Sequence, residues 1–159
     1  MKHEVLLAKA VAVVITLLTL VGIARAGESE EWITALFSRY RAPKELTGIV
    51  ISAGEKFGID PKVIAAIIVV ESSARPKAVS KGGDYGLMQI RWRVHQKDIQ
   101  RRFPAVKTAE DLFDPHVNVY IGTELFARYS SQRNTLRGAL LRYSGGNKTM
   151  ADRVLKLLK

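Results

Sequence analysis

The feature that most constrains this fold is the run from Val63 to Val70 (VIAAIIVV), in which every residue is apolar. Asp60 and Pro61 precede it, a pair that is typical of a helix N-cap followed by the first helical residue. A helix that is apolar on every side has no face to turn towards water, so it belongs in the middle of a core. The run therefore predicts a central helix surrounded by other elements, and Glu71 follows it directly.

Helical periodicity also dominates the chain before this run, and no convincing strand alternation appears. Trp32, Leu36 and Tyr40 would share one face of a short first helix. Pro43 would open a second helix, since proline suits the first helical position, and Gly58 would end it.

Downstream of the run, residues 72–86 are rich in turn formers and predict an ordered loop. Residues 87–103 resume a helical pattern with many basic residues. Asp114-Pro115 would open another helix, residues 136–143 would form the next, and a short basic helix would follow a break at residues 144–147. Together these segments predict an all-α fold, a compact bundle of six or seven helices.

The first 26 residues have the pattern of an export signal. Two lysines lie within residues 1–9, an uncharged run of 15 residues covers positions 10–24, and Ala24-Arg25-Ala26 ends the segment. This order is typical of a secretory signal peptide, and the run is shorter than the ~20 apolar residues that cross a bilayer comfortably. An uncleaved membrane anchor through residues 10–24 is the alternative. In both cases we expect an exported protein, in the periplasm or the cell envelope, either free or anchored to the inner membrane.

The charge of the chain indicates an anionic partner. The sequence has 25 Lys+Arg against 15 Asp+Glu, a net charge of +10, and +8 remains without residues 1–26, which carry three basic residues and one acidic residue. For an exported protein an anionic envelope polymer is the better match, although a merely solvated basic surface explains the charge equally well. We expect no nucleic-acid partner, because the basic stretch 91–102 is accompanied only by Trp92 and Phe103 as aromatic residues. Cysteine is absent, which excludes disulfides and thiolate chemistry.

Glu71 is the first candidate for chemistry. A carboxyl group at the end of an apolar helix is poorly solvated on its helix side, and desolvation disfavours its charged form. Its pKa should therefore rise, so that it could hold a proton near neutral pH, as a general acid at a glycosidic oxygen must. Taken alone this signal is weak, because most glutamates at helix ends are surface residues or ion-pair partners.

The motifs around Glu71 make the case more specific. Glu71-Ser72 is followed about fifteen residues later by Gly86-Leu87-Met88-Gln89-Ile90, then by Asp114-Pro115 with Asn118 and Gly122, and finally by Tyr143 with Gly145-Gly146. With these motifs, residues 55–146 resemble the lytic transglycosylases of the soluble-lytic-transglycosylase (SLT) type, relatives of goose-type lysozyme. The resemblance implies a lysozyme-like fold with an active-site cleft over residues 43–159, preceded by a helical lead-in over residues 27–42. It implies no metal and no cofactor.

The resemblance also implies roles for single residues. Glu71 matches the catalytic glutamate of the family, while Ser80, Met88, Gln89 and Tyr143 match residues that bind the glycan near the cleaved bond. A structural alternative exists for two of them, since Met88 could fill the core and Tyr143 lies on the apolar stripe of its helix.

Three further residues would support the site. The Ser72 hydroxyl can bond local backbone groups at the helix end, and Gly86 permits a turn or a close backbone approach. Ser144 stands where the family usually has asparagine, with a shorter reach.

Two departures from the family pattern matter. Arg142-Tyr143-Ser144 replaces the usual Ala-Tyr-Asn, and Arg91-Trp92-Arg93 stands where the family often places Asn-Pro or Met-Pro. We expect the shorter reach of Ser144 to alter binding strength or subsite preference. Trp92 could either stack on sugars or be buried.

The activity implied by the resemblance is cleavage of the β-1,4 bond between N-acetylmuramic acid and N-acetylglucosamine in peptidoglycan, with 1,6-anhydromuramic ends as product. Glu71 would act first as acid and then as base. A hydrolytic muramidase of the same fold is one alternative, in which Asp84 would orient a water, whereas Asp84 is otherwise a turn residue. An inverting hydrolase would need the two carboxyl groups ~6.5–9.5 Å apart. The other alternative is a non-catalytic wall-binding module of a secretion, conjugation or phage machine.

Overall fold

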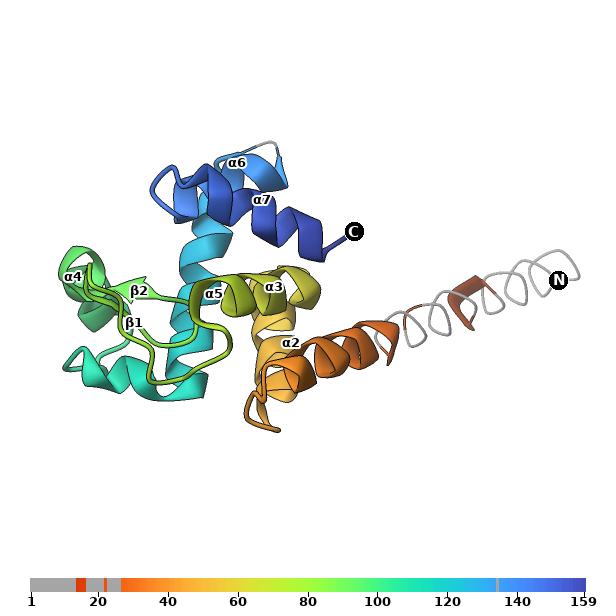
Figure 1. The fold of residues 1–159 in the computed structure, drawn as a ribbon, viewed down its shortest axis with the longest axis horizontal. Helices are drawn as coiled ribbons and strands as arrows, with labels where there is room; N and C mark the ends of the chain where they lie inside the picture. Colours follow the sequence, from red (N-terminus) through yellow and green to blue (C-terminus); the bar gives the residue numbers. More distant parts are fainter. Residues whose placement is uncertain (1–13, 17–21, 23–26, 134) are drawn as a thin grey trace, which may run out of the picture.

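The structure is a computed structural model that describes residues 14–16, 22, 27–133 and 135–159. It is mostly helical, which confirms the all-α prediction (Figure 1). After a helix over residues 27–39, the elements are α2 (Leu46–Phe57), α3 (Pro61–Ser72), β1 (Asp84–Tyr85), β2 (Ile90–Arg91), α4 (Trp92–Arg102), the 3-10 helix η1 (Glu110–Phe113), α5 (Pro115–Ser130), α6 (Leu136–Tyr143) and α7 (Lys148–Leu157).

Helix α3 is the central helix that its sequence predicts. The Asp60 carboxylate caps it by accepting a hydrogen bond from the Lys62 backbone N–H at 2.8 Å. Every residue from Val63 to Val69 is buried, and α2 and α7 pack against the helix. At its end Ser73 adopts a left-handed conformation with φ of 54°, so the chain turns away directly after Glu71 and Ser72.

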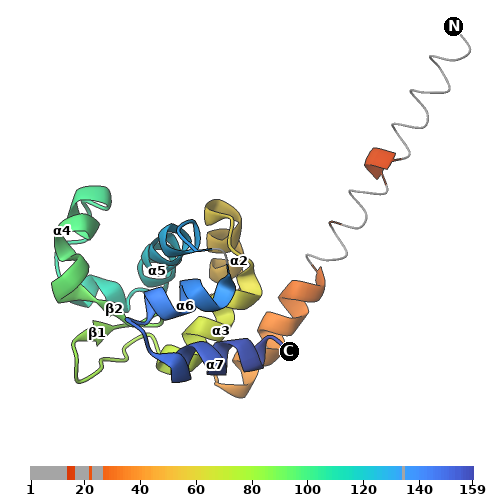
Figure 2. The same cartoon turned by 90° about the horizontal axis from the view of Figure 1, so that it is seen from above.

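The apolar side chains form two clusters with α5 between them. The larger cluster surrounds α3 and draws on the 27–39 helix, α2, α5, α6 and α7. The smaller cluster joins β2, α4, η1 and α5 through Ile90, Ile99, Val106, Leu112, Ile121 and Leu125. Figures 1 and 2 show α5 running between the side that holds α4, β1 and β2 and the side that holds α2 and α3. The molecule therefore has two lobes that share one helix.

Helix α5 begins as predicted, because Asp114 accepts a hydrogen bond from the Val117 N–H at 2.9 Å. It also buries charge on the smaller lobe. Glu124 is 5% exposed and pairs with Arg102 of α4 and with Arg128 of its own helix. These ion pairs tie α4 to α5 beside the apolar cluster.

Two of the expected helices differ in detail. Helix α2 begins at Leu46 rather than at Pro43, because the Pro43 carbonyl accepts a hydrogen bond from the Leu46 N–H in a turn ahead of the helix. In the 27–39 helix the buried residues are Ile33, Leu36 and Phe37, whereas Tyr40 lies beyond the helix and is exposed. The prediction that Tyr40 belongs to the apolar face of this helix was therefore wrong.

The predicted helix over residues 87–103 was also wrong in its first part. Residues 87–89 form a turn, and Ile90–Arg91 pair with Asp84–Tyr85 as a short antiparallel hairpin before α4 starts at Trp92. Two residues per strand are too few to show an alternating pattern. Trp92 is half-buried against the smaller cluster.

The predicted signal peptide or anchor, residues 1–26, falls almost entirely outside the described residues. Within the described part of the chain no helix has both the length and the apolar character that crossing a membrane requires.

Candidate active site

A cleft of about 400 Å³ lies where the two lobes meet. Its walls come from the end of α3, from the β1–β2 hairpin, from α4 and α5, and from α6 with the turn that follows it. Of the residues predicted to form the site, the cleft brings together Glu71, Asp84, Gln89, Tyr143 and Ser144.

Glu71 occupies the last turn of α3, at the end of the buried run. Burial is the main reason why its pKa rises from 4.5 to about 7, the negative charge of Asp84 adds to the rise, and Arg153 opposes it. Desolvation and a like charge both penalise the carboxylate form. Near neutral pH the Glu71 carboxyl is thus divided between its protonated and ionised forms, as general acid–base chemistry requires.

Asp84 faces the same cleft and is held in its ionised form. Its carboxylate accepts hydrogen bonds from Arg91 Nε at 2.6 Å, from Arg91 Nη2 at 3.0 Å and from Ser80 Oγ at 2.7 Å. Burial raises the pKa of Asp84, but the hydrogen bonds from Arg91 and Ser80, with the charge of Arg91, outweigh burial and lower it. The pKa values of the two carboxyl groups are therefore shifted in opposite directions. Glu71 is suited to act as an acid, whereas Asp84 provides a fixed negative charge beside it.

Tyr143 connects the two lobes at the cleft. Its hydroxyl donates a hydrogen bond of 2.7 Å to the Met88 carbonyl, and its ring packs edge-on against Phe126 and Tyr129. Burial, with the charge of Glu71, raises the pKa of Tyr143 well above its usual value. The phenol thus stays protonated and keeps the loop that follows Gly86 in place against α6.

The turn between β1 and β2 is shaped by two unusual backbone positions. Gly86 has φ of +75°, and a Cβ there would lie 2.8 Å from Asn118 Cγ and closer still to the Leu112 carbonyl oxygen. Gln89, a non-glycine residue, has φ of 50°, a conformation that persists only where its surroundings enforce it. Its side-chain N–H groups donate to the carbonyls of Gly86 and Ala78.

Asn118, which is fully buried on α5, holds this turn in place with three hydrogen bonds. Its side-chain oxygen accepts from the Met88 N–H at 2.8 Å, and its amide donates to the carbonyls of Tyr85 and Leu112 at 2.9 and 2.8 Å. One side chain therefore satisfies three backbone groups that would otherwise be buried without partners. The family resemblance includes Asn118, but the sequence alone did not indicate this role.

Two predicted glycan contacts do not line the cleft. The side chain of Met88 is fully buried against Gly122 and Thr123, where a Cβ on Gly122 would come within 2.5 Å of the sulfur. A role of Met88 in binding the glycan stays a prediction. Ser80 lies behind Asp84, where its hydroxyl donates to that carboxylate and accepts the N–H groups of Gly82 and Asp84. Ser80 therefore acts on the cleft indirectly, by holding the Asp84 carboxylate in place.

The other supporting residues act on the backbone. The Ser72 hydroxyl donates to the Ile68 carbonyl at 3.0 Å, one turn back in α3. Ser144 accepts the Asn147 N–H at 3.1 Å and so shapes the turn between α6 and α7.

Several lining residues had no role in the sequence prediction, among them His95, Tyr129, Arg142 and Asn147. His95, on α4, is half-buried, and burial with the charge of Arg128 lowers its pKa, so the imidazole is neutral near pH 7. Only the departures from the family pattern at Arg91 and Arg142 could have directed attention to this wall.

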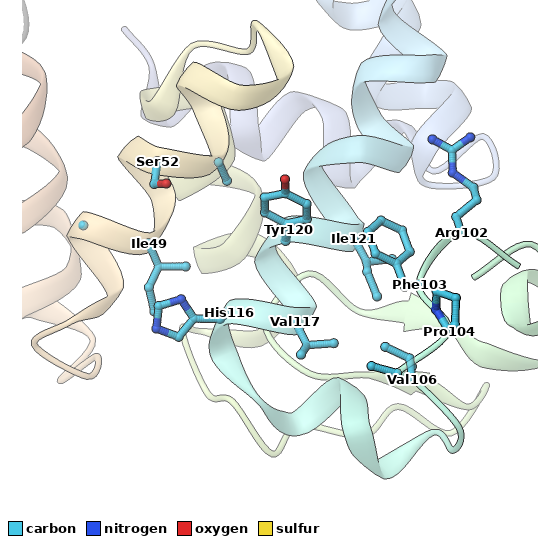
Figure 3. Close-up of a pocket in the computed structure, with 13 residues that line it drawn as sticks. Ile49, Ser52, Arg102, Phe103, Pro104, Val106, His116, Val117, Tyr120 and Ile121 are labelled. Atoms are coloured by element: carbon cyan, nitrogen blue, oxygen red, sulfur yellow. The ribbon is translucent and has the colours of Figure 1, made fainter. Parts of the chain in front are cut away.

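A second, more open cavity of about 570 Å³ lies between α2, the residues after α4 and the start of α5. Figure 3 shows it faced mainly by apolar side chains, with Ile49, Phe103, Pro104, Val106, Val117 and Ile121 among them. No aspartate or glutamate is among the described residues that line it. Of these two cavities, only the first is lined by described carboxyl groups, those of Glu71 and Asp84. Among the described residues no group of three or more His, Cys, Asp or Glu is placed to hold a metal ion.

A comparison with known protein families agrees with the helical fold. Residues 48–156 match the family described as the transglycosylase SLT domain, whose members cleave glycosidic bonds of peptidoglycan. The match covers about two thirds of the 159 residues and includes every residue named above for the cleft. The chain therefore belongs to the SLT transglycosylase family.

Proposed function

We propose that this protein is a peptidoglycan lytic transglycosylase that cleaves the β-1,4 bond between N-acetylmuramic acid and N-acetylglucosamine and leaves 1,6-anhydromuramic ends. The observation that carries the proposal is the Glu71 carboxyl, held in a cleft at a pKa of about 7 beside the ionised Asp84. A single carboxyl with this pKa can give up a proton and take one back within one turnover.

In the first step Glu71 acts as an acid. Its proton passes to the oxygen that links the two sugars, the bond from that oxygen to C1 of the muramic residue breaks, and the N-acetylglucosamine part leaves as an alcohol. The muramic acetamido oxygen stabilises the positive charge that develops at C1. The ionised Asp84 supports this step from the protein side, because its charge keeps the proton on Glu71 until the substrate binds.

In the second step the Glu71 carboxylate acts as a base. It removes the proton from the muramic 6-hydroxyl, and O6 closes onto C1 to form the anhydro ring. Glu71 ends the cycle protonated, as it began, and no water is consumed. The step needs no second carboxyl, in contrast to glycosidases that use one carboxyl as acid and another as nucleophile or base.

The rival reaction is hydrolysis with Asp84 as the group that activates a water. The contacts of Asp84 favour the lyase, because both of its oxygens already accept hydrogen bonds, one from Arg91 and the other from Arg91 and Ser80. A base whose pKa is lowered in this way is also a weaker proton acceptor. Asp84 thus serves better as a fixed charge than as a base.

The place of action that fits this substrate is the cell envelope. The pattern of residues 1–26 supports export to the periplasm, free or with an inner-membrane anchor, and the basic surplus supports contact with an anionic wall polymer. An envelope-spanning secretion, conjugation or phage machine is the class of partner that such an enzyme would serve by opening the wall. Fusion of residues 1–26 to a reporter enzyme that is active only outside the cytoplasm tests export directly.

The activity is tested by digesting purified peptidoglycan with the full-length protein and identifying the muropeptides by mass spectrometry. We expect anhydromuropeptides from the wild type and none from Glu71→Gln, which keeps the shape of the side chain but cannot transfer the proton. Glu55→Gln, at an exposed glutamate on α2, is the matched control and should retain activity.

The other results have distinct meanings. Products heavier by one water, with reducing ends, would show a muramidase and would return attention to Asp84. If both proteins bound the wall and neither released fragments, the chain would be a binding module.

A further inference from the structure

Arg142 is a cation of the catalytic cleft that the reaction does not use. It lies on α6 directly before Tyr143, at the position where the family usually has alanine, and it lines the same cleft as Glu71. Its guanidinium carbon lies 5.6 Å from the centre of the Tyr129 ring. A guanidinium stacked on an aromatic face is held in orientation while its N–H groups stay free at the edge.

Within the part of the chain that the structure describes, the charges around the cleft leave Arg142 without an ionic partner. Arg91, the other arginine that lines the cleft, is bound through two nitrogens to both oxygens of Asp84. Four further arginines, Arg101, Arg102, Arg128 and Arg137, form ion pairs outside the cleft. Among the described residues no carboxylate pairs with Arg142, and Glu71 is neutral when it acts as the acid. An oriented cation therefore faces the place where the glycan binds.

The chemistry of the glycan supplies an anion of the right kind. N-acetylglucosamine has no charge, whereas N-acetylmuramic acid carries a lactyl group with a carboxyl function. That carboxylate is free in strands without peptide, and in peptide-bearing strands it forms an amide with a peptide that has carboxylates of its own. The guanidinium fork matches a carboxylate with two parallel hydrogen bonds.

We propose that Arg142 forms a carboxylate-binding subsite in the cleft, which recognises the acidic substituent of a muramic residue next to the cleaved bond. This inference rests on the proposed peptidoglycan substrate and adds a specificity that the usual alanine could not provide. The subsite distinguishes muramic acid from N-acetylglucosamine by charge, so it also fixes the register in which the strand lies over Glu71.

The test measures binding separately from cleavage. In the full-length Glu71→Gln protein, affinities are measured by calorimetry for three tetrasaccharides: a peptide-bearing muropeptide, the same glycan after removal of the peptide by an amidase, and uncharged chitotetraose. We expect Arg142→Ala to weaken binding of a carboxylate-bearing strand about tenfold, which is 1.4 kcal/mol. We expect Arg142→Lys, which keeps the charge but not the fork, to recover part of the loss.

Two controls define the result. Arg39→Ala removes the same charge from an exposed position of the 27–39 helix outside the cleft, and it should leave all three affinities unchanged. Binding of chitotetraose should not respond to Arg142→Ala. A loss confined to the peptide-bearing strand assigns the subsite to a peptide carboxylate, and a loss confined to the peptide-free strand assigns it to the lactyl carboxylate.

The proposal is overturned if both carboxylate-bearing strands bind Arg142→Ala as tightly as the parent, or if chitotetraose loses affinity to the same extent. Because the measurement uses a protein that cannot cleave, it stands apart from the digestion experiment. Discrimination by Arg142 without anhydromuropeptides from the wild type would refute the lyase reaction and retain the subsite.

Discussion

Replacing Glu71 with glutamine should stabilise the protein by an amount that grows between pH 4.5 and about 7 and stays constant above that. Burial and the charge of Asp84 raise the pKa of Glu71 from 4.5 to about 7 in the folded state. Below pH 4.5 the carboxyl is neutral in both the folded and the unfolded chain, so glutamine changes little. Between pH 4.5 and 7 the unfolded chain loses this proton while the folded protein retains it, and the stability contributed by the protonated group falls as the pH rises.

The size of the effect follows from the two pKa values. At 1.36 kcal/mol for each pH unit that separates them, ionised Glu71 lowers the free energy of unfolding by at most about 3 kcal/mol above pH 7. Glutamine carries no charge and avoids this penalty. For a domain of this size the gain would raise the melting temperature by roughly 6–12 °C.

The assay is urea unfolding of wild type and Glu71→Gln at several pH values from 4 to 8.5. The informative quantity is the difference between the two proteins, because groups unaffected by the substitution cancel. Glu55→Gln, at an exposed site, should stay within about 0.5 kcal/mol of the wild type throughout. A difference for Glu71→Gln that does not grow between pH 4.5 and 7 would refute the claim that burial and Asp84 destabilise the carboxylate.

Three further predictions follow from the site. The kcat/KM for peptidoglycan should fall about tenfold per pH unit above pH 7, where Glu71 loses its proton. In Asp84→Asn this fall should begin at a lower pH, because removal of the negative charge lowers the pKa of Glu71. A pH–rate profile measures both, and complete inactivity of Asp84→Asn at every pH would favour Asp84 as a catalytic base. Gly86→Ala should lower the free energy of unfolding by about 3 kcal/mol, because the new Cβ overpacks the site and the backbone has a positive φ. Gly48→Ala, which has open space around its Cβ, should instead stabilise α2 by ~0.5–1 kcal/mol. Similar melting temperatures for the two variants would contradict the clash at Gly86. Tyr143→Phe keeps the ring but leaves the Met88 carbonyl without its donor, so urea unfolding should show a loss of about 1–2 kcal/mol, and an unchanged midpoint would contradict the hydrogen bond.

The parts of the fold that the sequence predicts well are those with a local cause. The all-apolar run made α3 a core helix, and the Asp-Pro pairs at residues 60–61 and 114–115 marked two helix starts, because side-chain caps act within three residues. Glu71 was found for a similar reason, since its desolvation follows from the helix that carries it.

The rest depended on contacts between distant segments. Whether Met88 faced the glycan or the core was decided by Gly122, more than thirty residues away, whose missing side chain leaves room for the sulfur. The hairpin of β1 and β2 depends on Asn118 in the same way. The pairing of Asp84 with Arg91 could not be foreseen either, because the expected helix over residues 87–103 would have pointed Arg91 elsewhere.

The attachment of Glu71 to the most deeply buried helix affects how the enzyme can lose activity. Every residue of α3 from Val63 to Val69 is buried. The amide hydrogens of these residues should therefore exchange with solvent only when the whole domain unfolds. The acid cannot be disordered by a local fluctuation, as it could on a surface loop, and heat inactivation should coincide with global unfolding. A regulator that silences this enzyme without denaturing it would therefore have to act on the opposite wall of the cleft, at the hairpin or at α6.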